Sequence, residues 1–121
     1  MKVTLYIKPC AKARPRMTKT GHAYMPKAYM DWRKLFRQLW HNCVPAFPPF
    51  DKNIAVHVEF HTLTGNMRPD VDNATAAVLD ALQDVKAITN DRYVKDHSGK
   101  VIKSETARIV ITINSLLSDP Q

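Results

Sequence analysis

The spacing of apolar residues switches repeatedly between two periods along this chain of 121 residues, which limits the folds open to it. Apolar side chains alternate with polar ones, as in β-strands, over residues 2–8, 54–61, about 93–103 and 108–114. They recur at helical spacing over residues 26–43 and 71–85. The third strand pattern is interrupted at Ser98-Gly99. The order β-α-β-α-β-β predicts an α/β fold, with a mixed sheet packed by two helices.

The length fits one small domain, so we expect residues 1–121 to form a single unit. Residues 9–25 lose the periodicity and carry several basic side chains and two prolines, which predicts a basic loop or a small ribbon. Residues 115–121 are expected to be a frayed tail. Prolines at 45, 48 and 49 end the first helical pattern and form a stiff connector.

Charge is unevenly distributed along the chain. Residues 1–50 hold ten Lys or Arg and one acid, whereas the rest holds eight bases and ten acids, so the halves carry +9 and −2 of the total of +7. A basic half beside a locally acidic half suits a nucleic acid partner together with a metal site. Many small proteins are basic without binding nucleic acid, so charge alone leaves this open.

Two aspartates, Asp70 and Asp72, stand where the second helical pattern begins, and Asp91 follows its end. Carboxylate oxygens are the ligands that Mg²⁺ prefers. The competing interpretation is that one aspartate caps the helix and the other interacts favourably with the helix dipole. The spacing alone does not separate a metal site from a cap.

Other acidic and histidine residues have simpler explanations. His57, Glu59 and His61 share one face of a predicted strand and could bind zinc, but a polar face of a half-exposed sheet explains them better, because no fourth ligand has a recognisable spacing. Asp80 and Asp84 lie within the second helix, where a structural role is favoured over a ligand role.

Several of these residues together resemble the RusA-type Holliday junction resolvases, a family often carried by prophages. The motif Arg68-Pro69-Asp70-Val71-Asp72-Asn73 with Ala77–Leu82 resembles the family's D-x-D-N and L-D-A-L helix. Asn90–Val94 resembles its acidic turn, and residues 14–16 with 21–26 resemble its basic amino-terminal segment. The resemblance covers about residues 8–113, most of the chain.

The resemblance implies a homodimer that resolves four-way DNA junctions by paired nicks in DNA recombination and repair. It implies that Asp70, Asp72 and Asp91 are the catalytic carboxylates and bind Mg²⁺, with Mn²⁺ as a substitute, and that Asn73 is a helix-start or outer-shell residue. The side chains expected to contact DNA phosphates are Lys12, Arg14, Arg16, Lys19 and Arg68. Tyr24 could stack on an unpaired base, whereas Tyr29 and Trp32 fit the core better.

One position departs from the family pattern. A lysine is usual four residues after the second aspartate, and this chain has Ala76 there. Another cation must then serve, with Arg68, Lys86, Arg92 and the basic loop as candidates. The departure keeps two alternatives open: a non-catalytic or degenerate branched-DNA-binding protein, and a nuclease acting on other branched nucleic acids.

The expected location is the bacterial cytoplasm, on nucleoid DNA. Cys10 and Cys43 form no CxxC pair, no amino-terminal stretch looks like a signal peptide, and no apolar run approaches the roughly 20 residues of a membrane helix. We therefore expect no membrane partner.

Overall fold

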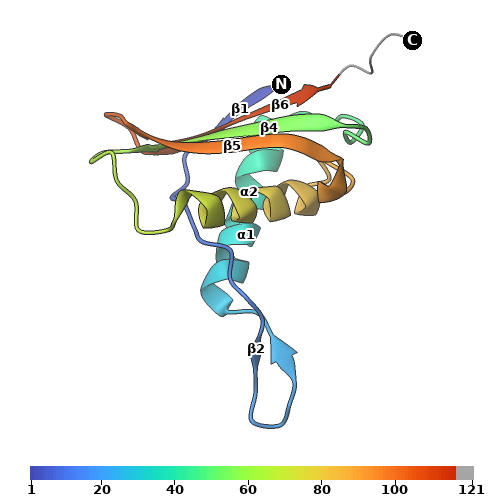
Figure 1. The fold of residues 1–121 in the computed structure, drawn as a ribbon, viewed down its shortest axis with the longest axis vertical. Helices are drawn as coiled ribbons and strands as arrows, with labels where there is room; N and C mark the ends of the chain where they lie inside the picture. The colour runs from blue at the N-terminus through green and yellow to red at the C-terminus, as the bar shows by residue number, and fades with distance from the viewer. Residues whose placement is uncertain (117–121) are drawn as a thin grey trace.

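A four-stranded mixed sheet frames the molecule, and both helices lie on one of its faces (Figure 1). In this computed structural model, which describes residues 1–116, the strand order is β1-β6-β4-β5. The strands are β1 (Lys2–Leu5), β4 (Ile54–Thr62), β5 (Val94–Lys103) and β6 (Arg108–Ser115). Only β4 and β5 are parallel to each other; β6 is antiparallel to both β1 and β4. The predicted α/β class and mixed sheet are confirmed.

Helix α1 (Lys27–Cys43) presents a row of aromatic side chains to the sheet. Pro26 precedes its first turn, where the missing N–H of proline is no loss. The rings of Tyr29, Trp32, Phe36 and Trp40 recur at helical spacing and are all buried. Successive centroids along this row are 6.5, 5.5 and 6.0 Å apart. Burying one such ring stabilises the fold by about 1.5–3 kcal/mol, so this row anchors α1.

Helix α2 (Val71–Asp84) links the parallel strands β4 and β5. The helix begins after the carboxyl end of β4 and returns to the amino-terminal end of β5. It therefore runs antiparallel to these two strands (Figure 1). Its buried face is made of small and medium residues, among them Ala74, Ala77 and Val78. Small side chains let the helix approach the strands closely.

Gly99 is the point of closest approach between β5 and α2. A Cβ atom at this position would overlap Thr75 Oγ1 and lie 2.9 Å from Val71 Cγ1. The strand nevertheless runs without a break from Val94 to Lys103, so the predicted interruption at Ser98-Gly99 is wrong. The glycine marks a close contact with the helix and not an end of the strand.

The amino-terminal segment leaves the sheet after β1 and forms a small ribbon. Strands β2 (Arg16–Met17) and β3 (Ala23–Tyr24) pair antiparallel, and Gly21, with φ of 85°, belongs to the turn between them. Figure 1 shows this ribbon projecting well away from the sheet. The small ribbon that the sequence allowed is therefore present.

The carboxyl-terminal strand is longer than expected. Ser115 is the last residue of β6, and the backbone N–H of Leu116 donates to the carbonyl of Asn53 at 2.9 Å. These two residues were predicted to belong to the frayed tail, which is wrong for them. The rest of that prediction, residues 117–121, lies outside the described residues.

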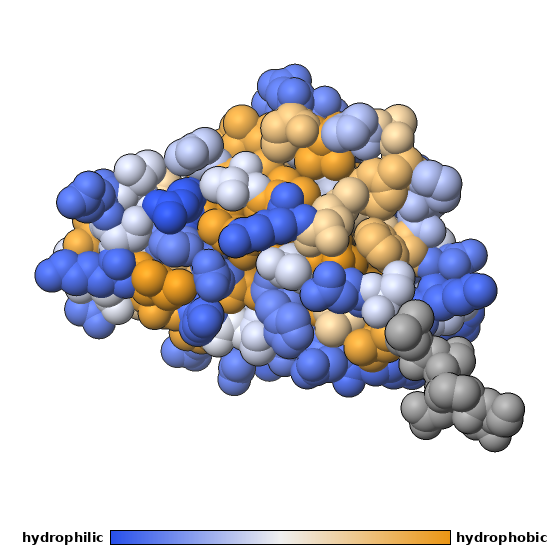
Figure 2. Space-filling view, turned by 90° about the horizontal axis from the view of Figure 1, so that it is seen from above, coloured by the Kyte–Doolittle hydropathy of each residue, from blue (hydrophilic) through white to orange (hydrophobic). Residues whose placement is uncertain are grey.

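Within residues 1–116, the other face of the sheet carries no helix (Figure 1). Residues on β4 alternate, so Val56, Val58 and Phe60 face the helices while His57 and Glu59 lie on the open face. Figure 2 views the molecule from above and shows polar and apolar side chains intermixed. The polar residues that alternate with apolar ones along β4 therefore belong to the face of the sheet that no helix covers.

Candidate active site

Asp70 and Asp72 lie at the exposed start of α2. Asp70 occupies the N-cap position, and its backbone carbonyl accepts a hydrogen bond from the N–H of Ala74 at 2.8 Å. Its side chain makes no capping hydrogen bond. Within residues 1–116, neither carboxylate has a hydrogen bond or ion-pair partner, which leaves their oxygens available. The capping interpretation therefore does not account for Asp70.

The basic amino-terminal segment is attached to this same helix. The backbone N–H of Lys12 donates to the carbonyl of Asn73 at 3.1 Å, in the first turn of α2. The ammonium of Lys12 lies 3.5 Å from Oδ1 of Asp80, about two turns further along the same face of α2. The backbone of the basic segment is thus fixed beside the two free carboxylates, while the Lys12 ammonium itself is paired with Asp80. The sequence predicted the basic segment and the aspartates at the helix start, but not the hydrogen bond between Lys12 and Asn73. No local pattern encodes a hydrogen bond across 61 residues.

The other basic side chains lie further along the ribbon. Arg14, Arg16 and Lys19 are exposed, and Arg16 belongs to β2. Arg68 is exposed and immediately precedes the turn into α2. The ribbon therefore extends the positive surface outward from the helix start, as a backbone-binding arm would require.

Asp91 lies at the other end of α2. It opens the short 3₁₀ helix η1 (Asp91–Tyr93), directly before β5. Strands β4 and β5 are parallel, and α2 begins just after the carboxyl end of β4. The amino-terminal end of β5 therefore lies at the opposite end of the strands from the start of α2. A helix of 14 residues spans about 21 Å at 1.5 Å per residue. One chain therefore does not bring Asp91 to Asp70 and Asp72.

A metal site must be judged against this separation. Over residues 1–116, no group of three His, Cys, Asp or Glu side chains is close enough to hold a metal ion. Mg²⁺ is commonly bound by one or two carboxylates together with substrate phosphates and water. The two free, exposed carboxylates at a rigid helix start fit that donor set. The assignment of all three aspartates as metal ligands stays a prediction.

Asp80 and Asp84 hold the two helices together. Asp80 accepts a hydrogen bond of 2.7 Å from the hydroxyl of Tyr29. Asp84 pairs with Arg33 through two bonds of 2.6 Å each, and this contact raises the pKa of the guanidinium further. The structural role favoured for these two acids is the one observed.

The histidine and glutamate row on β4 forms pairs on the open face of the sheet. Nε2 of His61 lies 3.1 Å from Oε1 of Glu59, and this hydrogen bond lowers the pKa of the Glu59 carboxyl. Nδ1 of His57 lies 2.6 Å from the hydroxyl of Ser98. These contacts are those of a polar, partly exposed face of a sheet.

Ala76 lies one turn after Asp72 on the same side of α2. Among the candidate replacement cations, Arg68 lies near the two aspartates in sequence, whereas Lys86 and Arg92 lie toward the Asp91 end. The guanidinium of Arg92 sits 4.9 Å from the ring centroid of Tyr93 and donates to its hydroxyl at 2.9 Å. The candidate cations are thus divided between the two ends of the helix.

A small α/β domain with free carboxylates beside a basic arm has the features of a nuclease. The family model described as Endodeoxyribonuclease RusA matches residues 7–114, and the chain belongs to this family. The resemblance noted in the sequence is therefore confirmed. No curated protein matches the chain.

Family membership implies an endonuclease that resolves Holliday junctions and binds branched DNA. Resolvase nucleases typically use divalent metal ions. Over residues 1–116, neither helix combines the length and the hydropathy needed to cross a membrane.

Proposed function

We propose that this chain is a Mg²⁺-dependent resolvase that acts as a homodimer and introduces paired nicks into four-way DNA junctions. The observation that carries the proposal is the free state of Asp70 and Asp72, next to the turn to which Lys12 is bonded. Carboxylates alone would repel a phosphate. Bound cations and a basic arm reverse that sign locally.

The roles of the chain's own residues follow from their positions. Asp70 and Asp72 would hold the ion, with Asp91 as the third carboxylate. When bound, the ion would supply an activated water and polarise the phosphoryl oxygen. Arg14, Arg16 and Lys19 would grip backbone phosphates, which fixes the position of the DNA without reading its sequence.

A second copy of the chain would bring an Asp91 carboxylate close to Asp70 and Asp72. Strand β5 is an edge strand of the sheet, is ten residues long and is mostly exposed. Two β5 strands paired antiparallel would place the Val94 end of one beside the Lys103 end of the other. Lys103 lies near the turn that leads into α2, since a Cβ at Gly65 would be 3.2 Å from it. Asp91 of one copy would thus approach Asp70 and Asp72 of the other.

A junction-cleavage assay tests the proposal. The wild type should produce paired nicks with Mg²⁺ and none with a chelator, and Asp72→Asn should bind junctions without cutting them. Asp31→Asn is the matched control, because Asp31 is an exposed helical acid that is paired with the neighbouring Lys27. Cleavage that is unchanged in Asp72→Asn would refute the assignment.

The alternative of a non-catalytic junction-binding protein rests on Ala76. Without the lysine usual in the family, a cation that stabilises charge on the phosphate is absent from this helix turn. A wild type that binds four-way junctions but cuts them with neither Mg²⁺ nor Mn²⁺ would favour this alternative. Cleavage of forks or flaps in preference to four-way junctions would favour a different branched substrate.

A further inference from the structure

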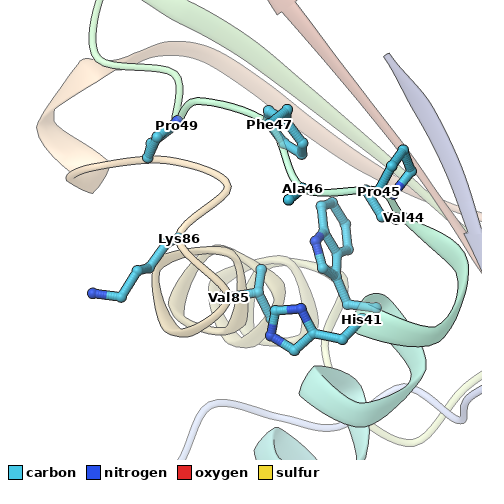
Figure 3. A pocket seen from close by; sticks show the side chains of 9 residues that line it. His41, Val44, Pro45, Ala46, Phe47, Pro49, Val85 and Lys86 are labelled. Atoms are coloured by element: carbon cyan, nitrogen blue, oxygen red, sulfur yellow. The ribbon is translucent and has the colours of Figure 1, made fainter.

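A cleft of about 390 Å³ opens between the ends of the two helices and the proline-rich connector (Figure 3). Figure 3 shows His41 and Val85 on the helical side, facing Phe47 on the connector. Ligand sites for small molecules usually measure about 300–1,000 Å³, so this cleft is large enough for one. It lies away from the two free aspartates, at the opposite end of α2.

Aromatic side chains from two separate segments line this cleft. Trp40 is the last ring of the aromatic row on α1, stacked at 6.0 Å on Phe36. Phe47 comes from the connector and is held in an edge contact with Phe50 at 5.9 Å. Both rings are therefore fixed before any ligand binds. Trp40 is 2% exposed and closes the inner side of the cleft, so the half-buried Phe47 is the ring that a flat ligand with a π face would meet.

The charges around the cleft favour an anion. Its nine lining residues, all of them within the described chain, include His41 and Lys86 and no acidic side chain. Asp84, the nearest acid on α2, is already paired with Arg33. Figure 3 shows the Lys86 side chain directed outward from the rim, so a flat ligand in the cleft would meet this cation with a phosphate that projects out of the cleft.

Lys86 holds an unusual backbone conformation at the rim of this cleft. Its φ is 60°, in the left-handed region where glycine is favoured. The N–H of Ala87 bonds the carbonyl of Leu82, and the N–H of Lys86 bonds that of Gln83, which is the helix-ending arrangement that glycine usually completes. A lysine here costs stability that glycine would not. This conformation places the cationic side chain of Lys86 at the rim of the cleft, where glycine would leave none.

The cleft is tied to the Asp91 end of the molecule. The N–H of Phe50 donates to the carbonyl of Ala87 at 2.9 Å, and that of Thr89 donates to the carbonyl of Phe50 at 3.1 Å. These bonds join the connector to the segment that leads into η1. DNA engaged near Asp91 would therefore lie within reach of the cleft.

We propose that this cleft binds one unpaired nucleobase, with the adjoining phosphate at Lys86. The base would lie against Phe47 and the edge of Trp40, a contact that tolerates every base because each has a π face. The proposal deepens the proposed function, since a distorted branch point supplies unpaired bases. It makes the cleft a device for recognising branched rather than continuous duplex DNA.

The test uses the full chain without metal and a fluorescent oligothymidylate, compared with an abasic oligomer of equal length. The wild type should bind the oligothymidylate at least about fivefold more tightly. Phe47→Ala should remove this difference, and Phe47→Leu, which keeps apolar bulk, should remove it as well. Tyr6→Ala, at an exposed aromatic residue outside the cleft, is the aromatic control and should preserve it. Equal binding of both oligomers by the wild type, or a difference that survives in both Phe47 variants, would overturn the proposal.

Lys86→Gly separates strain from binding. The variant should have a higher melting temperature, because glycine adopts the left-handed backbone conformation without strain. It should also bind both oligomers less tightly, by a similar factor, because one phosphate contact is lost. Unchanged affinity with raised stability would show that Lys86 has no binding role and would overturn that half of the proposal. If the Phe47 variants instead alter the oligomeric state, the cleft is a protein contact. None of these readouts depends on cleavage, so failure of the nuclease proposal would leave them unaffected.

Discussion

The hydroxyl of Tyr29 donates a hydrogen bond of 2.7 Å to Oδ2 of Asp80, joining α1 to α2 in the interior of the helical layer. Tyr29 is 2% exposed. Burial, followed by the bond to the Asp80 carboxylate, raises the pKa of the phenol. The same acid lies 3.5 Å from the ammonium of Lys12, whose backbone is bonded to the start of α2. This one aspartate therefore connects α1, α2 and the basic segment.

We expect Tyr29→Phe to lower the free energy of unfolding by about 1.5–3 kcal/mol, the range for a hydrogen bond to a charged group. The pKa of folded Tyr29 lies above the ordinary value of 10.0, so this stabilisation is fully present below that pH and is lost as the pH rises through the folded pKa. Urea unfolding at neutral and alkaline pH measures both effects. The control is Tyr6→Phe, at a residue that is 69% exposed, and equal losses in the two variants would contradict the account.

Gly99→Ala should destabilise the protein by about 1–3 kcal/mol, because the added methyl overpacks the contact between β5 and α2. The main obstacle is Thr75 Oγ1. The cost should therefore be smaller in a Thr75→Ala background, and a double-mutant cycle of unfolding free energies measures the coupling. Strictly additive effects would show that the two residues do not compete for space.

Much of the fold could be predicted from the sequence because hydrophobic periodicity is local. The alternation over 54–61 and the helical stripe over 26–43 correspond to β4 and α1 within a residue or two. The break expected at Gly99 was wrong because a glycine in a strand marks either a break or a close contact, and only the position of α2 decides which.

The candidate site was harder to predict from sequence. Asp70 stands at an N-cap position, where a cap was the ordinary expectation, yet its side chain caps nothing. The distance between Asp91 and Asp70 depends on the parallel pairing of β4 and β5, a contact between segments 40 residues apart in the sequence. Spacing in the sequence carries no information about that distance.

Arg16→Ala should weaken junction binding and lower the magnitude of its salt dependence by about 0.9, the slope expected for one phosphate contact. Arg16 is exposed on β2, in the ribbon that projects from the body of the protein (Figure 1). Binding titrations over a series of salt concentrations give the slope. Arg37→Ala, an exposed arginine on α1, should leave it unchanged. An unaltered slope in Arg16→Ala would remove the ribbon from the interface.

Ala76→Lys should accelerate junction cleavage by about tenfold or more and change junction affinity little. The lysine would lie one turn from Asp72, where it can stabilise charge that develops on the phosphate. Single-turnover cleavage rates, with Ala76→Gln as an uncharged control of similar length, measure the effect. If both variants cut at the wild-type rate, this helix turn does not face the phosphate.

The most direct test of the account mixes two inactive variants, Asp70→Asn and Asp91→Asn, under conditions that allow subunits to exchange. Each variant alone should bind junctions and cut none. A mixed dimer would retain one intact site, formed by the unaltered Asp91 of one copy and the unaltered Asp70 of the other. We predict that mixing restores Mg²⁺-dependent cleavage as single nicks. Mixtures that stay inactive despite verified exchange would contradict a catalytic site shared between two copies.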